Sequence, residues 1–166
     1  AIVMFYSYCK RFTSLAHIVL GISLGIAPVG AYMAVTGTST WECWVLALIV
    51  MTWCSGFDII YALQDAEFDR ENGLHSIPSH FSARTSLIIS TLLHIASIFL
   101  LVVFATSQPQ SWLLWVGCSV FALILASEHY IVTPTHQRNI GIAFGTFNAL
   151  ASLSLATFLI INLVVC

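Results

Sequence analysis

Charged residues are scarce in this sequence. Lysine, arginine, aspartate and glutamate together make up 7% of its 166 residues, whereas 59% of the residues are hydrophobic. An ordinary soluble domain carries about 25% charged residues, and this chain has too few charges to cover a soluble fold of its size. Lipid is therefore the expected solvent. The net charge of −2 and the lack of a dense basic run argue against a nucleic-acid partner.

Paired cysteines are also lacking. The five cysteines are scattered without a CxxC spacing, and three of them lie inside apolar runs, where cysteine behaves as a small hydrophobic residue. We therefore predict neither a disulfide framework nor a thiolate metal site. We expect no cleavable signal peptide, because the first apolar stretch leads into residues 6–11 without a basic n-region or a small-residue cleavage site.

Long apolar runs are abundant. Five stretches reach about 20 residues, the length that an α-helix needs to cross the hydrocarbon core of a membrane. They cover residues 13–35, 41–63, 85–105, 111–132 and 140–165. Residues 1–5 look like the end of a further apolar segment. The expected fold is all-α, a polytopic transmembrane helix bundle that forms a single domain over residues 1–166.

The basic residues of the chain gather on one side of such a bundle. Successive spans alternate in direction, so the segment before the first span and the loops 64–84 and 133–139 share a face. These segments hold every lysine and arginine: Lys10, Arg11, Arg70, Arg84 and Arg138. The positive-inside rule makes that face cytoplasmic. The short opposite loops predict tight hairpins, and GxxxG pairs at residues 21–25 and 141–145 predict close helix packing.

Acidic residues also lie toward this face, and three of them are periodically spaced. Asp58, Asp65 and Asp69 are seven and four residues apart, so on one helix they point in nearly the same direction, at about 100° per residue. We expect them to converge on one cavity at the cytoplasmic side. Glu67 and Glu71 lie off this line and are expected to be solvated.

A divalent cation explains such a column of carboxylates. Carboxylates repel one another, and Asp58 lies in an apolar run where a charge is costly. Mg²⁺ binds one or two carboxylates together with water and substrate phosphates, and the basic residues of the same face can neutralise an anionic substrate. A lipid diphosphate fits both the charges and the apolar surroundings. The sequence therefore predicts a metal-bridged diphosphate site.

The same segment carries a family resemblance. The pattern D-x-x-Y-A-x-x-D-x-x-x-D at residues 58–69, followed by G-L-H-S-I-P at 73–78, resembles the second aspartate-rich motif of the UbiA superfamily of intramembrane prenyltransferases. Y-x-K-R-F-T at residues 8–13 is similar to the segment that precedes this motif in 4-hydroxybenzoate polyprenyltransferases. F-x-x-x-N at residues 144–148 is a weaker likeness. The resemblance runs from Tyr6 to Asn148 and looks closest to the quinone-pathway branch.

The resemblance implies a nine-helix all-α fold in which two aspartate-rich motifs help Mg²⁺ to hold a prenyl diphosphate. It implies that Asp65 and Asp69 are metal ligands and that Lys10 and Arg11 face the diphosphate or the aromatic acceptor. The substrate-binding residues that it implies are Asp58, Tyr61, Arg70, His75, Ser76 and Asn148. It also implies an integral protein of the bacterial inner membrane, with the aspartate-rich loop on the cytoplasmic side.

The chain departs from the family pattern in its extent. It carries five of nine spans, and the first aspartate-rich motif is absent from it. We expect it to be the C-terminal part of a longer enzyme, because residues 1–5 look like a helix cut midway. The other interpretation is a shortened relative that cannot hold the diphosphate alone.

The histidines make no metal-ligand spacing with a third partner. His94 stands alone in an apolar run and is expected to be a hydrogen-bonded packing residue. The cluster Glu128-His129-Tyr130 at the end of the fourth span is a candidate contact for the acceptor.

Two functions stay open from the sequence. One is Mg²⁺-dependent transfer of a polyprenyl group from a prenyl diphosphate to a hydroxybenzoate-like aromatic acceptor in ubiquinone or menaquinone biosynthesis. The alternative is a non-catalytic UbiA-like membrane subunit that binds lipid, quinone or pigment among other membrane subunits. The second aspartate-rich motif favours the enzyme, and the missing first motif favours the subunit.

Overall fold

The computed structural model describes residues 2–109, 111–135 and 140–165, and helices dominate it. The long helices are α2 (Ala16–Thr36), α3 (Trp41–Ala62), α6 (Ala83–Thr106), α7 (Trp112–Ile131) and α9 (Asn148–Val165). The shorter segments are α1 (Ile2–Cys9), the 3₁₀ turn η1 (Leu63–Asp65), α4 (Ala66–Glu71), α5 (Ile77–His80), α8 (Ile140–Ile142) and the π-helical turn η2 (Ala143–Phe147).

The five predicted spans are confirmed. Five helical stretches of the described chain are long and apolar enough to cross a membrane, over Ala16–Thr36, Trp41–Glu71, Ala83–Thr106, Trp112–Ile131 and Ile140–Val165. The bounds predicted from the apolar runs agree with these bounds within a few residues. The exception is the second stretch, which continues through η1 and α4. No β-strand occurs among the described residues.

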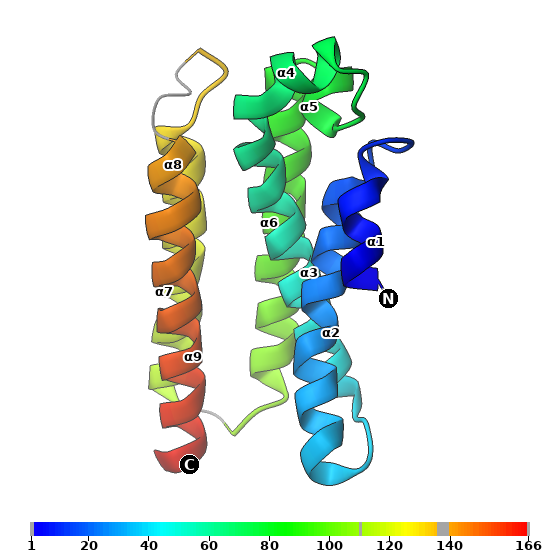
Figure 1. Ribbon diagram of the computed structural model, residues 1–166. Coiled ribbons are helices and arrows are strands. Elements are labelled where there is room, and N and C mark those ends of the chain that lie inside the picture. Colours follow the sequence, from blue (N-terminus) through cyan, green and yellow to red (C-terminus); the bar gives the residue numbers. More distant parts are fainter. Residues whose placement is uncertain (1, 110, 136–139, 166) are drawn as a thin grey trace.

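The long helices alternate in direction along the bundle (Figure 1). The connections α2–α3 and α6–α7 lie at one end, and α4 and α5, the α1–α2 connection and the α7–α8 connection lie at the other. Lys10, Arg11, Arg70 and Arg84 all belong to segments of this second end. The predicted clustering of basic residues therefore holds for these four, while Arg138 lies outside the described residues.

Helix α2 packs closely on α3 through its small residues. Gly21 and Gly25 are buried, and a Cβ built on Gly25 would lie 2.6 Å from the carbonyl oxygen of Ala47. The close approach predicted for the first GxxxG pair is thus confirmed. For the second pair it is wrong, because a Cβ on Gly141 or Gly145 would meet nothing within 4 Å.

Helix α3 is the centre of the bundle. Its buried residues join those of α6, α7 and α9 in one hydrophobic cluster that includes Ile49, Leu101, Phe121 and Leu155. Serines of α6 add hydrogen bonds to α3, since Ser90 donates to the carbonyl oxygen of Gly56 at 2.7 Å and Ser97 to that of Ile49 at 3.1 Å. Helix α3 is therefore held by residues of three neighbouring helices.

Candidate functional site

The aspartate-rich segment does not continue α3 as one straight helix. The chain passes through the 3₁₀ turn η1 before α4 begins, and three residues at 120° rather than 100° each rotate the following side chains by about 60°. Asp58 and Asp69 are buried whereas Asp65 is exposed. The expectation that all three point together into one cavity is therefore wrong for Asp65.

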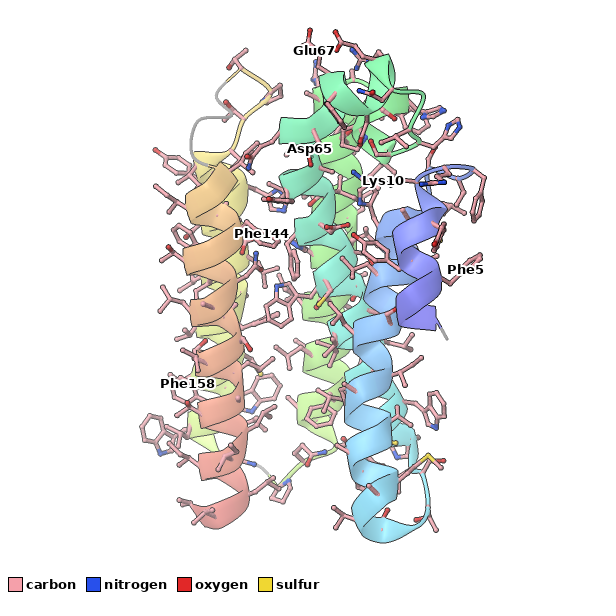
Figure 2. All side chains as sticks on the ribbon, viewed as in Figure 1. Phe5, Lys10, Asp65, Glu67, Phe144 and Phe158 are labelled. Atoms are coloured by element: carbon pink, nitrogen blue, oxygen red, sulfur yellow. The ribbon has the colours of Figure 1, made fainter. Side chains whose placement is uncertain are left out.

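Lys10 holds Asp69 from across the fold. Its ammonium nitrogen lies 2.9 Å from Oδ2 of Asp69, whose side chain is only 2% exposed. The backbone also joins these segments, since the amide of His75 donates to the carbonyl oxygen of Lys10 at 2.6 Å and the amide of Leu74 to that of Asp69 at 2.7 Å. Figure 2 shows Lys10 and Asp65 at the same end of the bundle. Of the residues predicted to share the site, Lys10 and Asp69 are thus brought into contact.

Asp58 has a different partner. His17 of α2 lies with Nδ1 2.7 Å from Oδ2 of Asp58, and its Nε2 accepts a hydrogen bond from the backbone amide of Ile77 at 3.3 Å. His17 is 1% exposed. No spacing pattern marks this histidine, because its two partners lie 41 and 60 residues away in the chain.

The loop of residues 73–80 covers this end of the molecule. It begins at Gly73, whose φ of 64° is a left-handed conformation that favours glycine. Ser76 then caps the short helix α5, where its hydroxyl accepts from the amide of Ser79. Ser76 is fully buried in this capping arrangement. Its contact with a substrate stays a prediction.

The remaining basic and histidine candidates lie at the surface. The Arg11 guanidinium stands 5.5 Å from the centre of the Tyr8 ring, and Arg70 donates from Nε to the carbonyl oxygen of Ser79 at 3.3 Å. Arg70 lines a cavity of about 390 Å³ whose lining includes Glu67 but not the three aspartates. His75 contacts His80, with Nδ1 and Nε2 3.2 Å apart. Arg70 is therefore placed beside the aspartate face rather than on it.

An aromatic wall extends from the aspartate end into the bundle. Tyr61 stacks on Phe144 with ring centres 4.2 Å apart, and Phe144 also contacts Phe57. One turn further along α3, Trp53 donates from its indole nitrogen to Oδ1 of Asn148 at 3.0 Å. Phe144 lies on the side of the C-terminal helix that faces α3 (Figure 2). Tyr61 and Asn148, both predicted site residues, thus belong to one surface.

The π-helical turn η2 explains the place of Asn148. A π turn leaves carbonyl oxygens out of the regular α-helical pattern, and the side-chain amide of Asn148 donates to those of Ala143 and Phe144 at 3.3 and 3.1 Å. Beside it lies an apolar cavity of about 430 Å³, lined among others by Pro28, Trp53, Phe57 and Ser152. The sequence could not reveal this cavity, because three separate helices form it.

The cluster at the end of α7 does not form one contact surface. Glu128 is fully buried, whereas Tyr130 is 86% exposed. His129 hydrogen bonds through Nε2 to Nδ1 of His94 at 2.9 Å. The prediction that His94 is a hydrogen-bonded packing residue is confirmed, and the candidate contact of the whole cluster with an acceptor is not supported.

The aspartate-rich end offers few protein ligands for a metal ion. Among the residues that the structure describes, no three histidine, cysteine, aspartate or glutamate side chains lie close enough together to hold a metal. Asp65 is exposed, whereas Asp69, four residues further on, is buried and paired with Lys10. Carboxylates suit Mg²⁺, which takes one or two of them and completes its shell with water and substrate phosphates.

The chain matches the UbiA prenyltransferase family over residues 1–163. Over 138 residues it is 31% identical to a 4-hydroxybenzoate octaprenyltransferase of Actinobacillus pleuropneumoniae serotype 5b, covering 83% of this chain and 46% of that relative. A protein of the same name from Francisella tularensis subsp. novicida is 25% identical over 130 residues, 78% of this chain and 45% of the relative.

A solved structure shares the fold. The apo structure of a UbiA homolog from Aeropyrum pernix K1 superposes with a TM-score of 0.81 at 26% identity, over 98% of this chain and 61% of that one. The helical bundle thus has a direct structural counterpart. The chain belongs to the UbiA prenyltransferase family. It spans about half the length of the relatives named above.

Proposed function

We propose that the protein containing this chain transfers a polyprenyl group from a prenyl diphosphate to a hydroxybenzoate-like aromatic acceptor in quinone biosynthesis. The observation that carries this proposal is the pair Asp65 and Asp69 with Lys10 already drawn to Asp69, at the end of an aromatic wall that leads to an apolar cavity. Relatives named 4-hydroxybenzoate octaprenyltransferase support it.

In this proposal the charged residues of the site bind the diphosphate, and the aromatic residues surround the prenyl group. Asp65 and Asp69 would hold Mg²⁺, which would polarise the diphosphate as a leaving group. Lys10 lies within reach of the same phosphates and compensates the charge that grows on the diphosphate as the C–O bond breaks. The rings of Tyr61, Phe144 and Phe57 form a dry wall for the allylic cation, which the electron-rich acceptor ring then attacks before it loses a proton.

We also infer the placement of the protein in the cell. The end of the bundle with α4 and α5 would face the cytoplasm of a bacterial inner membrane, because the described basic residues gather there. A water-soluble hydroxybenzoate-type acceptor then reaches the site from the cytoplasm, while the prenyl diphosphate keeps its isoprenoid chain in the lipid and its diphosphate head group at the site. The supporting observation is the shared position of Lys10, Arg70 and Arg84 at this end.

Substitution of the aspartates tests the proposal. In membranes that carry the full-length gene product, we expect Asp65→Asn and Asp69→Asn to reduce Mg²⁺-dependent transfer of a labelled prenyl group to an aromatic acid by at least about a hundredfold. Each change removes a charged ligand from a site with few protein ligands. The amount of protein inserted in the membrane, measured by immunoblot, should change little.

Glu71→Gln is the matched control, because Glu71 is an exposed acid of the same segment. It should leave activity within about twofold of the parent, as is usual for an exposed surface position. If both aspartate variants keep full activity, the catalytic proposal fails. A non-catalytic subunit that binds lipid, quinone or pigment then becomes the better account.

A further inference from the structure

His17 joins three segments that meet at the aspartate-rich end. It lies in the first turn of α2, contacts Asp58 in α3 through Nδ1 at 2.7 Å, and contacts the backbone amide of Ile77 through Nε2 at 3.3 Å. At 1% exposure it has no access to solvent. Both ring nitrogens therefore have protein partners, and neither is available to a ligand.

The partners decide which ring nitrogen carries the proton. A backbone amide can only donate, so Nε2 must accept from Ile77. Nδ1 then carries the hydrogen atom and donates it to the carboxylate of Asp58. A neutral imidazole with a fixed tautomer thus satisfies one buried acceptor and one buried donor at once. Without it, both groups would be left unpaired in surroundings where an unpaired polar group is costly.

The contact to Ile77 is one of three that fasten the loop of residues 73–80 to the segment of residues 10–17. The other two join the amide of His75 to the carbonyl oxygen of Lys10 at 2.6 Å, and His80 Nδ1 to the Ser14 hydroxyl at 3.3 Å. Lys10 in turn holds Asp69 through its side chain. The position of the loop and the position of two aspartates are therefore mechanically coupled.

We propose that His17 is a positioning residue that docks the loop of residues 73–80 onto α3 and fixes Asp58, so that the loop, Lys10 and Asp69 form a preformed diphosphate site. This inference rests on the proposed function. His17 touches no reacting atom in this arrangement. Its effect reaches the substrate through the loop backbone and through Lys10, whose carbonyl oxygen and ammonium group hold the loop and the aspartate.

Three substitutions at this position separate the two hydrogen bonds. In His17→Gln the amide carries a donor and an acceptor on one carbon, so it can serve both Asp58 and Ile77. In His17→Asn the amide is one bond closer to the backbone and serves one of the two partners. His17→Leu keeps the volume and serves neither. The series therefore removes the two hydrogen bonds of His17 to Asp58 and Ile77, here called the clamp, step by step. It does so without changing the charge of the side chain.

Amide hydrogen exchange of the full-length protein in detergent, without substrate, gives the first readout. We expect His17→Leu and His17→Asn to raise the exchange rate of residues 74–80 by at least about tenfold, whereas His17→Gln keeps the parent rate within about threefold. Ser97→Ala is the matched control. It also removes a buried hydrogen bond between long helices, but far from the loop, and should leave exchange of residues 74–80 unchanged.

Steady-state kinetics of the same proteins give the second readout. Loss of the clamp should raise the KM for the prenyl diphosphate by about 10–100-fold, the range typical of residues that orient ligands. The KM for the aromatic acceptor should change by less than about threefold, and His17→Gln should restore the diphosphate KM. A purely structural defect would lower the amount of active protein and leave both KM values as they are.

The outcomes that overturn the inference are distinct from failure of the proposed function. Unchanged exchange of residues 74–80 in His17→Asn overturns it, as does a His17→Gln protein that behaves like His17→Asn. If the His17→Leu protein does not insert into the membrane, the comparison of His17→Gln with His17→Asn still tests the inference. A parent protein that binds prenyl diphosphate but transfers nothing would defeat the proposed function alone, and the exchange pattern and diphosphate affinity would then test the clamp.

Discussion

At the scale of single residues, the ion pair between Lys10 and Asp69 joins the N-terminal segment to the aspartate-rich segment. Asp69 is almost fully buried, whereas the Lys10 side chain is 29% exposed. Lysine can therefore turn toward a diphosphate at the surface, while the aspartate cannot leave its place. In the proposed function, a metal ion at Asp69 would take the place that the ammonium group of Lys10 occupies here.

A double-mutant cycle tests this pair. We expect Lys10→Met to lower the free energy of unfolding by about 1–3 kcal/mol, because it leaves Asp69 buried without its cation. Asp69→Asn in the same protein should recover part of this loss, since the amide carries no charge. Thermal unfolding of the detergent-solubilised protein measures both. Additive effects of the two substitutions would show that the residues do not interact.

Single residues also mark the limit of sequence reasoning. The spacing of Asp65 and Asp69 predicted their place at one end of the bundle, because both belong to one local segment. His17 had no such pattern, since its partners become neighbours only when α2 packs on α3 and the loop folds back. Its tautomer is likewise set by a backbone amide that no motif encodes. A histidine near the start of an apolar run was the single available hint.

At the scale of elements, α2 can approach α3 closely because Gly25 has no side chain. A methyl group on Gly25 would meet the backbone oxygen of Ala47 at 2.6 Å, and a backbone atom cannot rotate away as a flexible side chain does. The two helices would have to separate. The first turn of α2 carries His17, so such a movement would also reach the aspartate end.

We expect Gly25→Ala to reduce the free energy of unfolding by about 1–3 kcal/mol through overpacking. Gly30→Ala in the same helix is the matched control, because a Cβ there meets nothing within 4 Å. That change should be neutral or stabilise by about 0.5–1 kcal/mol, since alanine favours helix more than glycine does. Thermal unfolding of both proteins in one detergent measures the difference. Equal effects of the two substitutions would contradict the packing argument.

Two irregular turns decide how the elements present their side chains. The 3₁₀ turn η1 separates α3 from α4, and the π turn η2 lies where Phe144 and Asn148 contact Tyr61 and Trp53 of α3. Periodicity alone predicts regular helices through both segments. The reason is physical, because a local switch of hydrogen-bonding pattern depends on tertiary partners such as Trp53, which bonds Asn148.

At the scale of the whole molecule, the alternation of the spans predicts which loops share a face. Asn72 precedes the loop of residues 73–80, and Thr38 and Ser107 lie in connections at the opposite end. All three are exposed. Four native cysteines, Cys9, Cys43, Cys54 and Cys118, are free and buried, so new cysteines at the exposed positions report the topology.

We expect a membrane-impermeant maleimide to label Asn72→Cys from the cytoplasmic side only, and Thr38→Cys and Ser107→Cys from the other side only. The reason is the odd number of spans between residues 38 and 72 and between 72 and 107, together with the basic residues near residue 72. Right-side-out and inverted vesicles carrying the full-length protein measure this, with the parent protein as the background. Labelling of all three from one side would refute the topology.

The sequence by itself determined the membrane environment, the number of spans, the face that gathers the charges and the family. These properties follow from composition and local spacing, since lipid admits only apolar helices and charges must leave it. Only the tertiary structure decided which aspartate is buried, which partner each one has and where the apolar cavity lies. Those depend on contacts between segments far apart in the chain, which side-chain packing fixes and periodicity does not record.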